Sequence, residues 1–135
     1  MEILIFAETD DKGNLKKDAY EIASYASEIS SENGGSVNAL CFNASNAESL
    51  SDYGVNKIIN SKNEELKNFD PSNYSKCISE VFNNEKCSLL ILSSSSNSKY
   101  IGGILSVLTD ASYVTNVISK PSDGEKMTVI RNTFT

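Results

Sequence analysis

A run of serines holds the most concentrated polar chemistry in this sequence of 135 residues. The mostly apolar residues 88–92 come directly before Ser93–Ser96 and Asn97, and apolar residues at helical spacing follow. This pattern predicts a buried strand, a serine loop and then a helix. Ligands of open α/β sheets dock at the carboxyl ends of central strands, where a helix N-terminus can also hold an anion. The candidate cofactor-binding residues of this loop are therefore Ser94, Ser95, Ser96 and Asn97.

Glu8 follows a second apolar run, residues 3–7, and is the carboxylate predicted to face the same crevice. A phosphate loop needs arranged glycines, but Gly102 and Gly103 fall inside the predicted helix, too late to cradle a phosphate. Serine runs at strand ends are common as solvated turns, and a lone carboxylate there is commonly a hydrogen-bond acceptor for a loop. The residues alone leave both interpretations open, a ligand contact and a polar turn.

Other chemistries lack the residues that they need. The sequence contains no histidine, which removes the usual general base, the imidazole metal ligand and any Ser-His or Cys-His nucleophile pair. Cys41, Cys77 and Cys87 have no CxxC spacing and fall on apolar segments, so we expect buried, reduced thiols. We predict no catalytic residue and no metal site.

Charge and hydropathy limit the partners. A net charge of −6 argues against binding to a nucleic-acid backbone. No apolar run reaches the length of a membrane span, and residues 1–3 enter a strand without the basic segment of a signal peptide. We expect a soluble, cytoplasmic domain with neither nucleic acid nor a membrane as its partner.

Strands and helices are predicted to alternate along the chain. Strands are expected at residues 3–7, 37–42, 56–60, 88–92, 113–118 and 127–133. Apolar stripes predict helices at residues 19–29, 47–53, 71–82 and 100–108. This alternation indicates an α/β fold, a doubly wound parallel sheet with helices on both faces. We expect the strand order 3-2-1-4-5, because 3–7 and 88–92 are the most apolar runs, with the last strand added antiparallel through a turn at 121–124.

Several segments resemble the N-terminal domain of the electron transfer flavoprotein α subunit. The opening strand with Ala7-Glu8 and the turn Asp11–Leu15 are similar to the start of that family. Gly34–Leu40 resembles its Gly-Gly-Glu-Val segment, and Ser93–Val117 resembles its small-residue loop, helix and strand. Thr128–Phe134 is similar to a family strand that carries an arginine. The likeness covers the whole chain and implies a Rossmann-like fold of the adenine nucleotide alpha hydrolase type.

The resemblance implies an electron-carrier subunit and not an enzyme. Such a carrier is a heterodimer with a β subunit, and it takes electrons from flavin dehydrogenases, such as acyl-CoA dehydrogenases, to a quinone oxidoreductase. The family's FAD is held mainly by the C-terminal domain of the α subunit, so no cofactor is expected in this chain alone. Residues 1–135 are then one N-terminal docking domain of a protein that is expected to continue into the FAD domain.

The docking surface is expected at the last strand and its neighbour, because no further helix follows in the sequence to cover them. The partner-interface candidates are Tyr113, Val117, Met127, Val129, Arg131 and Phe134. An uncovered sheet edge pairs readily with another chain, so self-association of the isolated domain is expected in the absence of the β subunit.

Two other functions stay open. One is a free-standing adenine-nucleotide-binding domain similar to universal stress proteins, although such a domain is expected to carry a glycine-rich phosphate loop near its last helix. The other is a small doubly wound hydrolase, which requires a general base that the histidine-free composition does not offer.

Overall fold

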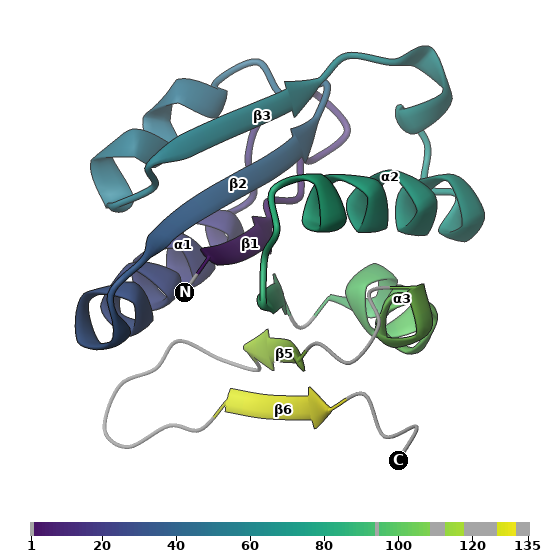
Figure 1. Ribbon diagram of the computed structural model, residues 1–135. Coiled ribbons are helices and arrows are strands. Elements are labelled where there is room, and N and C mark those ends of the chain that lie inside the picture. The colour runs from purple at the N-terminus through teal and green to yellow at the C-terminus, as the bar shows by residue number, and fades with distance from the viewer. Residues whose placement is uncertain (1, 94, 109–112, 118–126, 132–135) are drawn as a thin grey trace.

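The computed structural model describes residues 2–93, 95–108, 113–117 and 127–131 (Figure 1). The strands are β1 (Glu2–Phe6), β2 (Ser36–Phe42), β3 (Lys57–Ser61), β4 (Leu89–Ser93), β5 (Tyr113–Val117) and β6 (Met127–Arg131). The α-helices are α1 (Lys17–Asn33), α2 (Pro71–Asn84) and α3 (Ser96–Leu108), with short 3-10 helices η1 (Ala47–Tyr53) and η2 (Glu64–Leu66). None of the helices within these residues combines the length and the apolar character needed to span a membrane.

The sheet has the order β3-β2-β1-β4-β5-β6, which confirms the predicted doubly wound α/β fold. β1 lies between β2 and β4 and runs parallel to both, with Ile3 opposite Val37 on one side and Leu89 on the other. β5 continues the parallel set, and β6 pairs antiparallel with β5, as predicted. The predicted turn at 121–124 and the end of the last predicted strand, residues 132 and 133, lie outside the described residues.

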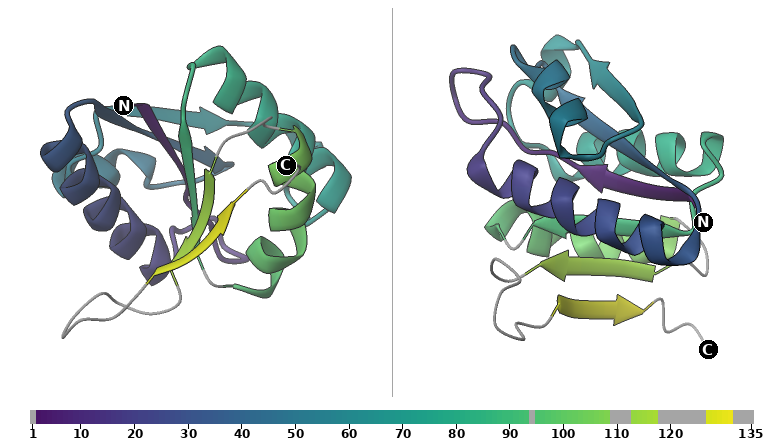
Figure 2. Two further views of the ribbon diagram at one scale, coloured as in Figure 1. Left: turned by 60° about the horizontal axis from the view of Figure 1, so that its bottom comes forward. Right: turned by 90° about the vertical axis from the view of Figure 1, so that its left-hand side faces the viewer.

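Both faces of the central strands are buried, because α1 covers one face and α2 and α3 cover the other (Figure 2). Ile3 and Ile5 of β1 join the core beneath α1, while Leu4 and Phe6 join the core beneath α2 and α3. Side chains of a strand alternate between its faces, so one strand of apolar residues supplies two cores at once. This double burial explains why the central strands show unbroken apolar runs.

Local signals set the helix ends. The Asp70 side chain caps α2 by accepting a hydrogen bond from the Asn73 N–H at 3.0 Å, and Pro71 occupies the first turn. α1 ends at Asn33, and the φ of the following Gly34, +72°, lies in the region that glycine adopts without steric strain. Both ends lie where the sequence predicts them.

Two predicted details of the serine segment are wrong. Ser93 is the last residue of β4 and is only 2 % exposed, because its hydroxyl finds a buried hydrogen-bond acceptor. Only some of the apolar residues predicted to form the buried face of the following helix are in fact buried. Ile101 and Leu105 are buried, whereas an exposed stripe runs along its outer side. We call this set the α3 stripe, and it consists of Tyr100, Ile104, Val107 and Leu108. The helix has only one covered face, which is too narrow to bury every apolar position.

Replacing Ile5 or Leu90 with alanine is expected to lower the free energy of unfolding by about 2–5 kcal/mol, because each side chain is fully buried and leaves a cavity. Leu108→Ala, at a position 44 % exposed, is the matched control and is expected to cost less than about 1 kcal/mol. Urea denaturation measures all three variants. Equal losses at the buried and exposed positions contradict the central placement of β1 and β4.

Candidate functional site

Glu8 lies two residues beyond β1, at the carboxyl edge of the parallel sheet. Its backbone carbonyl accepts a hydrogen bond from the Lys16 N–H at 2.9 Å. Thr9 and Leu15 pair antiparallel across the base of the loop between β1 and α1. The loop is therefore closed at its base, and it presents the Glu8 side chain where β1 and β4 both end.

The Glu8 carboxylate is buried and accepts hydrogen bonds from the end of β4 and from the connection between β4 and α3. The Ser93 hydroxyl donates to Glu8 Oε2 at 2.6 Å, and the Ser95 hydroxyl donates to the same oxygen at 2.5 Å. Lys16 Nζ lies 3.7 Å from Glu8 Oε1, although water screens this ion pair because the lysine side chain is 41 % exposed. A buried carboxylate requires such charge-assisted bonds. Glu8 thus joins the end of β1, the start of α1 and the serine segment.

Aromatic rings line the same small hollow as Glu8. The rings of Phe6, Phe42 and Tyr74 contact one another, with centroids between 4.8 and 5.8 Å apart. The Tyr74 hydroxyl donates to the Leu66 carbonyl at 3.1 Å. Burial raises the pKa of Tyr74, and the negative charge of Glu8 raises it further. Tyr74 therefore remains a neutral donor at physiological pH and has no role as a base.

The hollow between Glu8 and these rings, which we call the strand-end hollow, has a volume of about 40 Å³. A water molecule needs roughly 10–15 Å³ of such space, so the hollow has room for a few waters but is far too small to enclose a nucleotide. A phosphate group placed here also meets the negative charge of the carboxylate, a repulsion that low dielectric strengthens. The residues of this hollow do not fit FAD or an adenine nucleotide. Their arrangement holds two chain connections together.

The predicted loop residues have different places in the structure. Ser95 bonds to Glu8, as the predicted shared crevice requires, and Asn97 lines the strand-end hollow. Ser96 is the first residue of α3, and Ser94 lies outside the described residues. Sequence reasoning did not select Ser93, although a serine that directly extends a buried apolar strand, with a carboxylate expected nearby, is a usable signal.

A larger hollow of about 430 Å³ lies next to the ends of β1 and β2. Its polar groups already hold loops together. The Asp10 carboxylate accepts hydrogen bonds from the Lys12 and Asn14 N–H groups at 2.9 and 3.0 Å. The Asn43 side chain donates to the Asn63 carbonyl and accepts from its N–H, both at 2.9 Å. These bonds make the hollow a meeting point of two loops.

The predicted interface residues lie at one end of the sheet, as far as the structure describes them. Val117 stands opposite Met127 and Tyr113 opposite Arg131 in the antiparallel pair of β5 and β6, which also contains Val129. β6 is the outermost strand. Phe134 and the side chains of the other five lie outside the described part of the chain.

The cysteines are free thiols within the described residues. Cys41 and Cys87 are buried as predicted, whereas Cys77 is half-buried. Burial raises the pKa of Cys41 to about 11 and that of Cys87 to about 12, which suppresses the reactive thiolate at neutral pH. Across the described residues, no group of three or more histidine, cysteine or carboxylate side chains could hold a metal ion.

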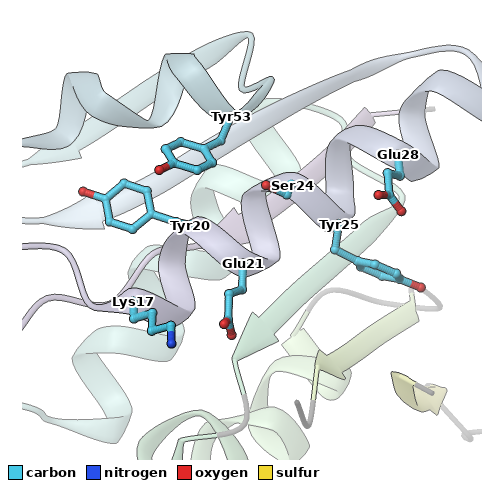
Figure 3. Close-up of a pocket in the computed structure, with 7 residues that line it drawn as sticks. All are labelled: Lys17, Tyr20, Glu21, Ser24, Tyr25, Glu28 and Tyr53. Carbon is cyan, nitrogen blue, oxygen red and sulfur yellow. The ribbon is translucent and has the colours of Figure 1, made fainter. Parts of the chain in front are cut away.

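A groove of about 440 Å³ on the outer side of α1 was not predicted from the sequence (Figure 3). We call it the α1 groove, and it is lined by Lys17, Tyr20, Glu21, Ser24, Tyr25, Glu28 and Tyr53. Six of these residues belong to α1, where they recur every three or four positions, and the seventh comes from η1. The helical spacing was available in the sequence, but the contribution of η1 depends on tertiary packing.

The order of the strands and the helices on both faces define a Rossmann-like α/β domain, and Glu8 occupies its strand-end crevice. A family model, the electron transfer flavoprotein domain, matches residues 3–135. The chain therefore belongs to the electron transfer flavoprotein domain family. Members of this family are flavin-binding electron carriers, and not enzymes, that work within electron transfer flavoprotein complexes. A comparison with curated proteins gave no match.

Ser93→Ala is expected to lower the free energy of unfolding by about 1.5–3 kcal/mol, because it removes a hydrogen bond to a buried carboxylate. Ser75 offers a matched control. It is 1 % exposed, and its hydroxyl has no hydrogen-bond partner among the described residues. Ser75→Ala is therefore expected to be neutral or stabilising. Urea denaturation compares the two, and equal effects would show that Glu8 does not depend on Ser93.

Proposed function

We propose that this chain is the N-terminal, non-FAD domain of an electron transfer flavoprotein α subunit, and that its function is to dock the β subunit. Family membership and the resemblance of segments such as Gly34–Leu40 and Ser93–Val117 to the α subunit support the proposal. In the complete complex, FAD belongs to the C-terminal domain of the α subunit. That complex takes electrons from flavin dehydrogenases and passes them to a quinone oxidoreductase.

The α3 stripe is the observation that carries the docking role. Tyr100 is 66 % exposed and Val107 is 58 % exposed, with Ile104 and Leu108 on the same face of the helix. Residues four, seven and eight positions apart share one side of a helix, so the four form a continuous apolar strip. Soluble monomers seldom expose apolar patches of more than a few hundred Å², and larger ones mark interaction sites.

The α3 stripe lies close to β5 and β6, the strands that the sequence predicts as the docking surface. α3 packs against β5 and β6, and β6 is the outermost strand of the sheet (Figures 1 and 2). A partner at this end of the sheet can cover the α3 stripe and the outer edge of β6 together. Such a combination helps to reach the roughly 800 Å² per partner that stable complexes bury.

The net charge of the chain opposes self-association, whereas α3 itself carries no negative side chain. The sequence of the helix contains no carboxylate, so it adds nothing to the acidic surface of a chain with net charge −6. Two copies of the chain repel one another through their net charge, whereas a different subunit need not. Self-association through β6 is then expected to be weaker than binding of the β subunit, and to be observed only when the β subunit is absent.

Tyr100→Ala combined with Val107→Ala is expected to weaken binding of the β subunit about tenfold or more, because exposed aromatic and apolar residues at an interface centre supply most of its affinity. Titration calorimetry of the full chain against purified β subunit measures the loss. Tyr53→Ala, at an exposed tyrosine on the opposite face, is the control and is expected to leave the affinity unchanged. Absence of binding, or an equal effect of the control, contradicts the proposal.

The purified chain is expected to bind no FAD, because the strand-end hollow of about 40 Å³ cannot receive it and a carboxylate faces the entering phosphate. The measurement is the visible absorbance of the desalted protein after incubation with excess FAD. Flavin retained in a one-to-one ratio to the chain contradicts the assignment of the cofactor to another domain.

A further inference from the structure

The α1 groove is separate from the α3 stripe, because α1 and α3 cover opposite faces of the sheet. Six of its lining residues follow one another along α1, and Figure 3 shows their side chains beside that helix. Tyr53 of η1 forms its far wall and is 41 % exposed. The groove and the α3 stripe therefore lie over opposite faces of the sheet, and variants at one leave the residues of the other unchanged.

Tyrosines dominate the lining. Three of the chain's six tyrosines, Tyr20, Tyr25 and Tyr53, lie here. The rings of Tyr20 and Tyr53 lie 4.8 Å apart between centroids, side by side in Figure 3. The Tyr20 hydroxyl is held by Ser49 Oγ at 2.9 Å, so its ring is fixed before any partner arrives. Rigid tyrosines supply contact area at a small entropy cost and are enriched at protein interfaces.

Two carboxylates flank the rings without partners of opposite charge. Neither Glu21 nor Glu28 forms an ion pair within the described part of the chain, and both line the groove, with Lys17 near its beginning. Burial raises the pKa of Tyr25, and the charges of Glu28 and Glu32 raise it further. Burial is the larger cause, and the two carboxylates add to it, so Tyr25 lies close to negative charge on this face of α1.

We propose that the α1 groove docks a helix of a partner protein that presents two arginines, each over a tyrosine ring and beside Glu21 or Glu28. A guanidinium stacks on an aromatic face and pairs with a carboxylate at once, which no other side chain does as well. The two carboxylates and the tyrosine rings of the lining are both complementary to such a side chain.

The spacing favours a helix in the groove. Glu21 and Glu28 are seven residues apart on α1, two helical turns or about 10 Å along the axis. Arginines seven positions apart on a second helix repeat the same distance. The groove suits a small ligand less well. Six of its seven lining residues come from one open helix face, whereas small-molecule sites enclose most of their ligand.

The test uses the full chain, labelled with ¹⁵N, and a synthetic alanine-based helical peptide with arginines at two positions seven apart. Saturable shifts of amide signals are expected in the segments 17–28 and 49–53. Exchanging both arginines of the peptide for glutamine is expected to weaken binding about tenfold, and exchanging them for lysine by a smaller factor.

Matched variants of the chain distinguish binding in the α1 groove from a general attraction of the peptide to the negative net charge of the chain. Glu21→Gln combined with Glu28→Gln is expected to weaken peptide binding about tenfold. Glu65→Gln combined with Glu80→Gln makes the same charge change at exposed positions away from α1 and is expected to have little effect. Tyr53→Ala removes an exposed ring without opening the core and is expected to weaken binding several-fold.

Three outcomes overturn the proposal. Equal weakening by both glutamate pairs means that the net charge alone attracts the peptide. Amide shifts outside the groove segments place the binding elsewhere. Binding of free arginine as tight as that of the peptide makes the groove a small-ligand site and not a helix-docking surface.

Discussion

Burial of β1 and β4 on both faces is the constraint on which the rest of the structure depends. Leu4, Ile5, Leu90 and Ile91 have no exposed surface, so helices must cover both sides of the sheet. Each buried side chain of this size contributes roughly 1.5–3 kcal/mol, whereas an ordinary hydrogen bond contributes about 1 kcal/mol net. The apolar pattern therefore determines the topology. Because the strands are parallel, that topology brings the carboxyl ends of β1 and β4 together.

Glu8, the residue at the carboxyl ends of β1 and β4, determines whether a ligand can bind there. Many α/β domains dock a ligand there, but Glu8 fills the position with a carboxylate already bonded to Ser93 and Ser95. The small hollow beside it suits a structural tether better than a phosphate site. We therefore propose that the outer surfaces of the domain carry its function. The α3 stripe and the α1 groove lie over opposite faces of the sheet, so under our proposals one domain can hold two partners at the same time.

The sequence predicted the features that depend on apolar periodicity, and it failed where tertiary contacts decide. The strand order and the approach of Glu8 to the serine segment followed from two unbroken apolar runs and from parallel pairing. Ser93 was assigned to a loop, because serine usually favours turns and its buried acceptor is 85 positions away in the sequence. The exposed side of α3 was assigned to the core, since periodicity does not show which neighbours a helix has. The pairing of Tyr20 with Tyr53 joins two segments that no local pattern relates.

We infer that Glu8 closes the strand-end crevice and that the domain acts through its surfaces. The most direct test is an NMR titration of the ¹⁵N-labelled chain with AMP and ATP, which follows the amide signals of Glu8, Ser93 and Ser95 and of the adjacent loop at residues 9–13. Because the crevice is filled, no saturable shift of these signals is expected at millimolar nucleotide. Saturable shifts centred on Glu8 and Ser95 would contradict it and would favour a free-standing nucleotide-binding domain.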